Sequence, residues 1–307
     1  MRIVRHPGAG GPQTAIAIGS FDGVHRGHAA ILDRVVAEAR ARTLEPAVLT
    51  FEPLPRELFS PATAPARLTS LSERLVEICR RQIAIAFVQR FDAAFAALTP
   101  QAFAERLRDV YGARWVMVGP DFRYGFRRAG DVAMLEAAGR TLGFEVAVLP
   151  QVSDTEGRIS STRVREALAS ADFDEAGRLL GRRYAITGRV MHGAKRGRAL
   201  GFPTVNIRLA RPKPPLTGIF AVKCFGAATR GLEGVASLGF NPAVNAQGPA
   251  TLEAFLFDFS GDLYGRRLSI EFLKKLRDEA HFASLDELAA QIRGDCDRAR
   301  EFFREGT

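Results

Sequence analysis

The stretch Thr14-Ala-Ile-Ala-Ile-Gly-Ser-Phe-Asp-Gly-Val-His-Arg-Gly-His28 decides the fold of the first half of the chain. Residues 14–18 form an apolar run typical of a buried strand, and the small residues of 19–23 predict a tight turn. After Gly27 the apolar residues recur at spacings of three and four, which predicts a helix. This order places backbone N–H groups and the positive end of a helix dipole at the carboxyl edge of the strand, where an anion binds well.

His25 and His28 are three residues apart at the start of this helix, so both imidazole rings can face one point. Each ring can donate a hydrogen bond to a phosphate oxygen while it stays neutral. Gly27 lacks a Cβ, which we expect to let a flat nucleotide group approach the backbone. Transfer of an adenylyl group needs such a site, because a triphosphate must be positioned and the charge at its α-phosphorus stabilised. The alternative is an ordinary strand–turn–helix joint with two surface histidines.

The composition is that of a globular protein. The chain has 307 residues, enough for two domains, of which 47% are hydrophobic and 25% are charged. We find no apolar run long enough to span a bilayer and no signal peptide, and we therefore expect a cytoplasmic protein without a membrane partner. Cys79, Cys224 and Cys296 lie far apart without metal-ligand spacing, so we expect reduced cysteines and no structural zinc site.

The net charge of +9 suggests a polyanion as partner. Most of the excess, however, is arginine scattered through predicted helices. The densest basic cluster, 182–198, contains glycines and precedes a predicted strand, which fits a loop around phosphates better than a surface for duplex nucleic acid. We therefore expect no nucleic acid as partner. A basic nucleic-acid-binding or tRNA-charging protein is the alternative from a different class.

Strand-like and helix-like segments alternate from the start of the chain to about residue 180. Short apolar runs of this kind are typical of a parallel sheet covered on both faces. We therefore predict an α/β doubly wound domain of nucleotidyltransferase type over residues 1–181, with ligands beyond the carboxyl ends of its strands. The predicted strands are 15–18, 47–51, 83–88, 115–118 and 146–149, and the predicted helices are 27–42, 72–80, 100–110 and 132–142.

The stretch Ile159-Ser-Ser-Thr-Arg-Val-Arg165 predicts a second anion site. Its hydroxyl groups can cap a following helix, and Arg163 or Arg165 adds positive charge. Such a site suits the pyrophosphate that departs during adenylyl transfer. The alternative is an ordinary serine cap with two solvated arginines.

Beyond residue 181 the pattern changes to successive strand-like runs without long helices between them. Glycine, proline and asparagine separate these runs, which predicts a small antiparallel β-barrel domain over residues 182–307 with a C-terminal helix at 285–303. The predicted strands are 184–190, 204–207, 218–225, 232–238, 252–259 and 267–272.

A basic, glycine-rich loop precedes the predicted strand at 204–207. Such a loop can wrap around phosphates, and here it does not have the sequence of a P-loop. The alternative is a mobile β-hairpin. The residues of this loop that we expect to contact nucleotide are Gly193, Lys195, Gly197 and Gly201.

Thr204 and Asn206 alternate along that strand, so their side chains share one face. A hydroxyl and an amide oxygen are suitable ligands for a phosphate-bound Mg²⁺. Glu253 is one polar residue in an apolar strand and is the candidate base. The alternative for Glu253 is an outward-facing side chain on an amphipathic strand.

Together these motifs resemble the prokaryotic bifunctional riboflavin kinase/FMN adenylyltransferase family over nearly the whole chain. The first half carries Gly-Ser-Phe-Asp-Gly-Val-His-Arg-Gly-His, Val-Gly-Pro-Asp-Phe-Arg-Tyr-Gly and Ile-Ser-Ser-Thr-Arg-Val-Arg in order. The second half carries Arg-Gly-Arg-Ala-Leu-Gly-Phe-Pro-Thr-Val-Asn, Leu-Glu-Ala-Phe-Leu-Phe-Asp-Phe and Asp262-Leu-Tyr-Gly. Each motif is moderately specific, and their common order makes the resemblance strong.

The resemblance implies two reactions that use ATP. In the barrel, riboflavin attacks the γ-phosphate of Mg²⁺-bound ATP and gives FMN, with Glu253 as base and with Thr204 and Asn206 holding metal and phosphates. In the first domain, FMN attacks the α-phosphate of a second ATP and gives FAD and pyrophosphate, with His25 and His28 stabilising the transferred phosphate. The resemblance also implies nucleotide contacts for Gly19, Phe21, Asp22, Gly23 and Gly27, pyrophosphate contacts for Ser161, Thr162 and Arg165, and flavin or nucleotide contacts for Asp121 and Phe122.

Three positions depart from the family pattern. Leu54 stands in place of a phosphate-contacting histidine, Ala194 in place of an aspartate, and Phe255 in place of a histidine two residues after the base. The loss of one transition-state donor at Leu54 implies a cost of roughly tenfold or more in adenylyl transfer. We expect both activities, and a riboflavin kinase with weakened or lost adenylyl transfer is the alternative. The oligomeric state does not follow from the sequence.

Overall fold

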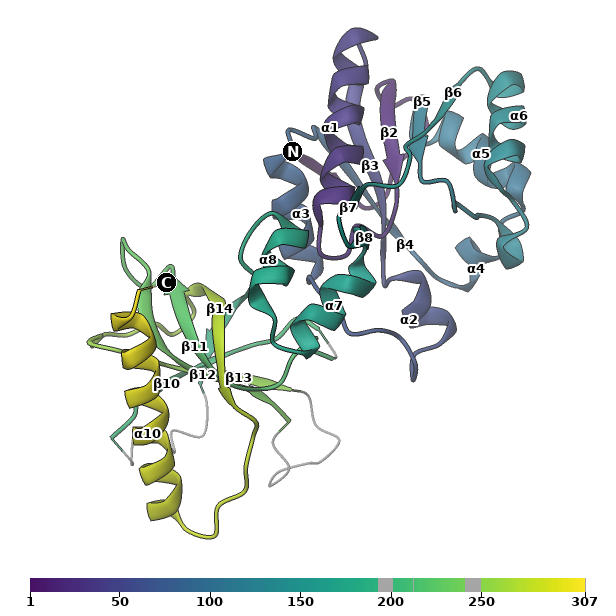
Figure 1. The fold of residues 1–307 in the computed structure, drawn as a ribbon. Helices are drawn as coiled ribbons and strands as arrows, with labels where there is room; N and C mark the ends of the chain where they lie inside the picture. The colour runs from purple at the N-terminus through teal and green to yellow at the C-terminus, as the bar shows by residue number, and fades with distance from the viewer. Residues whose placement is uncertain (193–200, 212, 241–249, 307) are drawn as a thin grey trace. The chain divides into compact units, whose positions relative to one another are not determined.

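The structure, a computed structural model, describes residues 1–192, 201–211, 213–240 and 250–306. The chain forms two compact units. The first comprises Met1–Pro65 and Leu71–Ser160, and the second comprises Ala66–Ser70 and Ser161–Thr307. Figure 1 shows a parallel sheet in the first unit and a barrel in the second.

A six-stranded parallel sheet forms the middle of the first unit, in the order β1–β4–β3–β2–β5–β6. The chain runs from β2 outwards to β3 and β4 and then returns to the other side of β2 as β5, so the strand order reverses between β2 and β5. Ligands of doubly wound sheets bind at this reversal, beyond the carboxyl ends of the strands. The strands are β1 (Arg2–Val4), β2 (Thr14–Ile18), β3 (Glu45–Glu52), β4 (Ile85–Arg90), β5 (Ala113–Val118) and β6 (Glu145–Val148).

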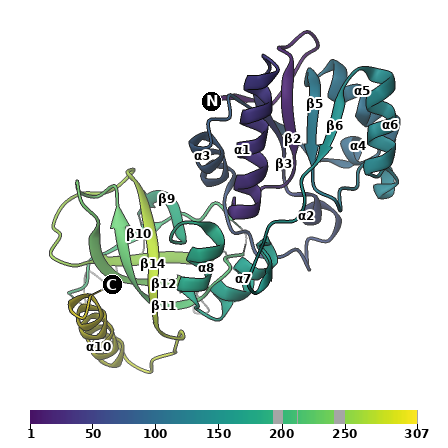
Figure 2. The same cartoon turned by 45° about the horizontal axis from the view of Figure 1, so that its top comes forward.

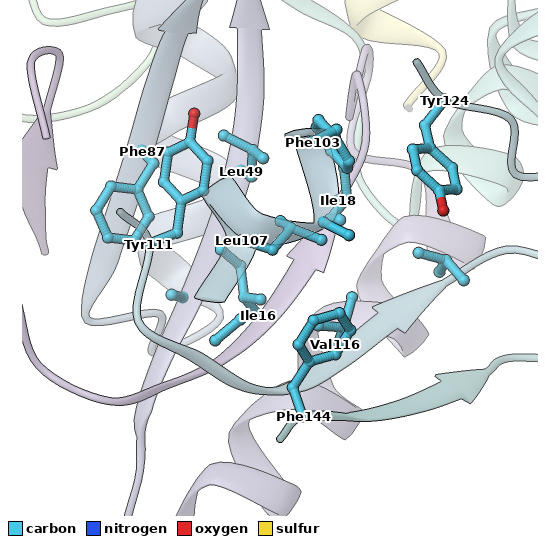
Figure 3. Packing of buried hydrophobic residues seen from close by; sticks show 14 of the residues in the cluster. Ile16, Ile18, Leu49, Phe87, Phe103, Leu107, Tyr111, Val116, Tyr124 and Phe144 are labelled. Carbon is cyan, nitrogen blue, oxygen red and sulfur yellow. The ribbon is translucent and has the colours of Figure 1, made fainter. Parts of the chain in front are cut away.

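Helices cover both faces of this sheet, because the side chains of its strands alternate between two apolar layers. On β2, Ala15 and Ala17 face the layer to which α1 and α3 contribute. Ile16 and Ile18 face the other layer, where Figure 3 shows them near Phe103 and Leu107 of α5. The helices are α1 (Arg26–Ala41), α2 (Pro55–Phe59), α3 (Leu71–Arg80), α4 (Ala93–Ala96), α5 (Pro100–Asp109) and α6 (Val132–Leu142), with a 3₁₀ turn η1 (Phe126–Arg128) and a small hairpin of β7 (Ser153–Asp154) and β8 (Gly157–Arg158).

The doubly wound fold predicted for the first half is confirmed. Every predicted strand and helix of that half is present, with ends displaced by a few residues. The sequence pattern does not predict β1, α2 or α4. With 3, 5 and 4 residues respectively, each is too short to show a period.

The second unit contains a closed antiparallel barrel in the order β10–β13–β12–β11–β14–β9. Pairing between β9 and β10 closes it. A closed barrel has no free sheet edge. Alternate residues such as Leu252 and Ala254 are fully buried in its interior. The strands are β9 (Ala185–Met191), β10 (Thr204–Ile207), β11 (Gly218–Phe225), β12 (Leu232–Gly239), β13 (Thr251–Leu256) and β14 (Arg267–Arg277).

The C-terminal helix α10 (Leu285–Arg304) packs on the outside of the barrel (Figure 2). Its Cys296 and Ala299 join Ile219 of β11 in an apolar cluster. Asp295 is only 2% exposed and accepts hydrogen bonds from Arg277 of β14, from Nε to Oδ1 at 3.0 Å and to Oδ2 at 3.1 Å, and from Nη2 to Oδ2 at 2.8 Å. This forked ion pair fixes α10 against the end of β14. The barrel with a C-terminal helix is therefore confirmed.

The second unit also includes α7 (Ser161–Ala169), α8 (Phe173–Leu180) and the short segment Ala66–Ser70. Arg211 Nη1 and the Tyr184 hydroxyl both donate to the carbonyl oxygen of Leu68, at 2.7 and 3.0 Å. These bonds bind the segment to the barrel unit. The compact units therefore divide the chain before α7, and the boundary at residue 181 stays a prediction.

Candidate active sites

The turn between β2 and α1 has an unusual backbone. Phe21, Gly23 and Val24 have φ angles of +49°, +83° and +41°. A positive φ is strained for a β-branched residue such as valine, and such strain concentrates at functional sites. The N–H of Val24 donates to the carbonyl oxygen of Phe21 at 3.2 Å and closes the turn. The turn thereby delivers His25 to the start of α1.

His25 caps the N-terminus of α1. Its Nδ1 accepts a hydrogen bond from the N–H of His28 at 3.3 Å. Because Nδ1 is the acceptor, the proton of the neutral ring lies on Nε2, where it can be donated to a ligand. The first turn of α1 has no acidic residue to offset the positive end of the helix dipole. An anion is therefore stabilised at this position.

His28 lies against His25, with ring centroids 3.8 Å apart and ring planes at 19°. The ring of Phe21 meets His28 edge-on, with centroids 5.3 Å apart. Burial lowers the pKa of His28 well below its usual 6.5, and the charges of His25 and Arg74 lower this pKa further. Its Nδ1 is buried without a hydrogen-bond partner in the described part of the chain. His28 thus offers a neutral ring with a polar atom that an incoming group can satisfy.

Two glycines make room for the aromatic rings of this turn. A Cβ on Gly27 would lie 3.0 Å from Cε1 and 3.1 Å from Nδ1 of His25. The space beside Gly27 therefore holds the His25 ring, and the approach of a nucleotide to Gly27 stays a prediction. A Cβ on Gly19 would lie 3.3 Å from the ring of Phe21. Phe21 and Asp22 are themselves buried, so the side chain of Phe21 supports His28 and does not offer an open stacking surface.

Asp121 and Phe122 lie in the loop after β5, which pairs in parallel with β2. Parallel neighbours end at the same edge of a sheet, so this loop and the histidine turn leave the sheet together. The ring of Phe122 stacks on Tyr124, with centroids 5.6 Å apart and planes at 16°. Asp121 accepts a hydrogen bond from Arg158 at 2.8 Å and is mostly exposed.

An aromatic series that the sequence analysis missed continues from this loop. Its outermost ring, Phe59 of α2, is 65% exposed. An exposed ring at the end of a packed aromatic series offers a stacking surface to a flat ligand. The centroid distances along the series are 5.2 Å for Tyr124 and Phe103, 6.1 Å for Phe103 and Phe95, 5.7 Å for Phe95 and Phe91, and 5.7 Å for Phe91 and Phe59.

Leu54 immediately precedes α2, in the loop after β3. Its side chain is buried, and its N–H donates to the Glu57 carboxylate at 2.9 Å. An apolar side chain therefore occupies the place where the family pattern has a histidine donor.

Ser161, Thr162 and Arg165 lie in the first half of α7 and belong to the second unit. Nε of Arg165 donates to the carbonyl oxygen of Ala66 at 2.6 Å, and Arg163 pairs with Glu175 at 2.5 Å. Both arginines thus have structural partners within that unit. Their part in pyrophosphate binding stays a prediction, because the histidine pair belongs to the other unit.

A cavity of about 660 Å³ lies between the outer face of the barrel and α10. Thr204, Glu253 and Phe255 contribute to its wall. In the pairing of β10 with β13, Asn206 lies opposite Glu253 and Thr204 lies opposite Phe255, so the four residues share one face. The hydroxyl of Thr204 donates to Oε2 of Glu253 at 3.4 Å. The structure therefore brings together the three polar residues that the sequence selects in the second half.

Glu253 does face outward from the barrel, as the alternative interpretation has it, but α10 covers that face and turns it into a cavity wall. The oxygen donors of Thr204 and Asn206 fit Mg²⁺, which prefers hard oxygen ligands. No group of three or more histidine, cysteine, aspartate or glutamate side chains able to hold a metal occurs among the described residues. A magnesium ion here would share its coordination with phosphates and water. In the basic, glycine-rich loop before β10, Gly201 has a φ of +86°. Gly193, Ala194, Lys195 and Gly197 of this loop lie outside the described residues.

The depressed pKa of His28 predicts acid-sensitive stability. As the pH falls below about 6.5, the unfolded chain protonates His28 before the folded chain does, so the folded state loses stability until the pH reaches the folded pKa. His28→Asn removes this titration. We expect its melting temperature to fall less than that of the wild type between about pH 7 and about pH 5 in thermal unfolding, with the exposed His6→Asn as control. Equal falls in all three proteins would contradict a half-buried His28 that stays neutral in the folded chain.

Comparison with known proteins covers both halves of the chain. A family model described as FAD synthetase matches residues 10–163, and one described as riboflavin kinase matches residues 180–303. The bifunctional riboflavin kinase/FMN adenylyltransferase of Escherichia coli K12 is 44% identical over 308 residues, which covers 99% of this chain and 98% of the relative. The protein of the same name from Pseudomonas fluorescens is 46% identical, over 92% of this chain and 91% of the relative.

A solved structure from Streptococcus pneumoniae, described as a macrolide-efflux protein, matches with a TM-score of 0.76 and 29% identity, over 96% of this chain and 97% of that one. Among the described residues of the present chain, we find no helix with the length and apolarity that a membrane crossing requires. The two family models and the curated relatives show that this chain belongs to the bifunctional riboflavin kinase/FMN adenylyltransferase family.

Proposed function

We propose that this chain phosphorylates riboflavin to FMN at the cavity of the second unit and adenylylates FMN to FAD at the histidine pair of the first. The observation that supports the proposal is that the residues selected as catalytic for each reaction lie together within one unit, the histidine pair in the first and the polar triad of the barrel in the second. His25 and His28 stack on each other, and Thr204, Asn206 and Glu253 share one face of the barrel. ATP is the co-substrate of both reactions.

In the kinase reaction, the carboxylate of Glu253 accepts the proton of the riboflavin hydroxyl while the hydroxyl oxygen attacks the γ-phosphorus of ATP. The bond from that phosphorus to the bridging oxygen breaks, and ADP leaves with the electron pair. Thr204 and Asn206 would hold Mg²⁺ and the phosphates. The metal, when bound, supplies positive charge that offsets the charge on the phosphate oxygens.

The cavity suits a flavin in size and character. About 660 Å³ is within the range of pockets that enclose a ligand of this size. Phe202 and Phe255 meet edge to face in its wall, with centroids 5.5 Å apart and planes at 89°. These rings provide an apolar side for the tricyclic ring, while Glu253 and Thr204 provide the polar side for the reacting hydroxyl. Phe255 thus supports binding where the family pattern has a histidine.

In the adenylyl transfer, a phosphate oxygen of FMN attacks the α-phosphorus of ATP, and pyrophosphate leaves with the electrons of the broken bond. The ring N–H groups of His25 and His28 donate to the oxygens on which charge develops, and the dipole of α1 adds to this stabilisation. Both rings can do this in the neutral state, and direct attack needs no covalent intermediate. Gly19, Asp22, Gly23 and Gly27 shape the nucleotide site through the turn.

The remaining assignments follow the same chemistry. Ser161, Thr162 and Arg165 bind the leaving pyrophosphate through hydroxyl, amide and guanidinium donors. Asp121 and Phe122 contact the flavin of FMN, and the exposed Phe59 is a further candidate for stacking. Both reactions take place in the cytoplasm without nucleic acid. RNA binding that weakens steeply with salt, without flavin turnover, would favour the nucleic-acid alternative.

Product analysis started separately from riboflavin and from FMN tests the two-site proposal. Wild type should convert riboflavin to FMN and then to FAD. His28→Ala should stop at FMN, because the kinase cavity lies in the other unit. Glu253→Gln should leave riboflavin largely unconverted but still make FAD from added FMN. A wild type that stops at FMN, or variants that lose both activities equally, would contradict the proposal.

Restoring the missing donor tests the effect of Leu54. Leu54→His places an imidazole in the loop after β3, and we expect FAD formation from FMN to rise, by up to about tenfold in kcat. Leu54→Met keeps the apolar character and volume and serves as the matched control. Steady-state kinetics with FMN and ATP provide the measurement. If Leu54→His gains nothing over Leu54→Met, the leucine does not limit adenylyl transfer.

A further inference from the structure

We propose that Arg74 of α3 is a positioning residue for adenylyl transfer, because its buried guanidinium joins the histidine turn to the loop after β3 and keeps a fixed positive charge near the histidine pair. This inference rests on the adenylyl transfer proposed above for the first unit. The sequence pattern does not indicate this role, because an arginine in an amphipathic helix is ordinarily solvated.

The side chain of Arg74 has no exposed surface, which is rare for arginine. Its Nη1 donates to the carbonyl oxygen of Ser20 at 2.7 Å. Its Nη2 donates to the carbonyl oxygen of Phe51 at 3.1 Å and to Oε2 of Glu52 at 2.9 Å. Ser20 lies in the turn that presents His25, and Phe51 and Glu52 end β3. One side chain therefore ties together the loops that follow two neighbouring strands.

The hydrogen bond from Arg74 to the Ser20 carbonyl oxygen holds the start of the strained turn between β2 and α1. Ser20 precedes Phe21, whose φ is +49° and whose ring contacts His28. The hydroxyl of Thr50 on β3 also donates to the Ser20 carbonyl oxygen, at 3.4 Å. These two donors fix the peptide group from which the turn starts. A shift of this peptide would move Phe21 and, through it, the ring of His28.

The geometry requires a guanidinium. Its donors form a rigid planar fork that can serve two directions at once, whereas a lysine ammonium is a single point charge on a flexible stem. Lysine at position 74 would keep the charge but could not donate to the carbonyl oxygens of Ser20 and Phe51 with the same fixed geometry. The bridging and the charge can therefore be separated by substitution.

The charge of Arg74 acts on the histidine pair. The charged and titratable groups that act on His28 are His25, at the start of the same helix, and Arg74, from α3. Glu52, with which Arg74 forms an ion pair, has a side chain that is 29% exposed, whereas the Arg74 side chain is fully buried. Burial is the main cause of the lowered pKa of His28, and the Arg74 charge lowers this pKa further. The same positive charge would attract a triphosphate.

Arg74 also lies at the base of the loop that lacks the family histidine. Glu52, which it contacts, is two residues before Leu54. The fixed charge of Arg74 therefore supplies electrostatic stabilisation close to the position where the hydrogen-bond donor is missing. This would make adenylyl transfer in this chain particularly sensitive to loss of Arg74.

Two substitutions of Arg74 in the full-length protein test the proposal. Arg74→Lys keeps the charge and removes the fork, and we expect kcat for FAD formation from FMN to fall by about 10- to 100-fold, with a smaller change in KM for ATP. Arg74→Met removes both the planar donor fork and the charge, and we expect it to lower kcat for FAD formation further. Riboflavin phosphorylation should stay at the wild-type rate in both variants. Arg80→Met, an exposed arginine on the same helix, is the matched control for both activities.

A pH titration of the His28 ring signals by NMR separates positioning from a merely structural role. Arg74→Met should raise the pKa of His28, because a positive charge is removed, while Arg74→Lys should change this pKa less. FAD formation within about twofold of wild type in Arg74→Lys would overturn the proposal, even if Arg74→Met fails to fold. An unchanged His28 pKa in folded Arg74→Met would also overturn it. A wild type that forms no FAD would instead overturn the proposed adenylyl transfer itself, and the Arg74 inference with it.

Discussion

The stacking of His25 on His28 over the first turn of α1 is the interaction on which the proposed adenylyl-transfer site depends. The His25 ring is fixed from three directions: by the hydrogen bond from the His28 N–H, by the face of the His28 ring and by the backbone at Gly27. The strained turn before it and the buried Phe21 keep this arrangement from relaxing. The same burial holds His28 neutral, so the pair can stabilise charge through ring N–H groups.

The two units build their sites in different ways. The first uses the carboxyl edge of a parallel sheet, where a helix N-terminus and loops after neighbouring strands meet. The second covers the outer face of a closed barrel with α10, and the buried ion pair of Asp295 and Arg277 holds that helix in place. Polar residues on the outside of β10 and β13 thereby become the wall of a cavity. In both units, packing outside the reacting residues determines where they point.

Periodicity and motif spacing predict the fold well, because long buried strands and amphipathic helices carry their own pattern. They predict that Thr204, Asn206 and Glu253 act together, since alternation along a strand is local information. They do not predict that the His25 ring lies against Gly27, because this neighbour is set by the side-chain conformation of His25. They also fail for Arg74, whose partners lie on two other elements. The aromatic series ending at Phe59 is missed for the same reason, since its rings come together only in the fold.

Thio-substituted ATP tests most directly whether His28 acts on the α-phosphate of ATP, as we propose. Sulfur accepts hydrogen bonds poorly, so an enzyme that donates to one non-bridging oxygen distinguishes the two diastereomers of ATP carrying sulfur at the α-phosphorus. With FMN as acceptor, we predict that wild type strongly prefers one diastereomer and that His28→Ala loses most of this preference. If His28→Ala slows FAD formation from ATP and from both diastereomers by the same factor, His28 does not contact the transferred phosphate and does not stabilise adenylyl transfer.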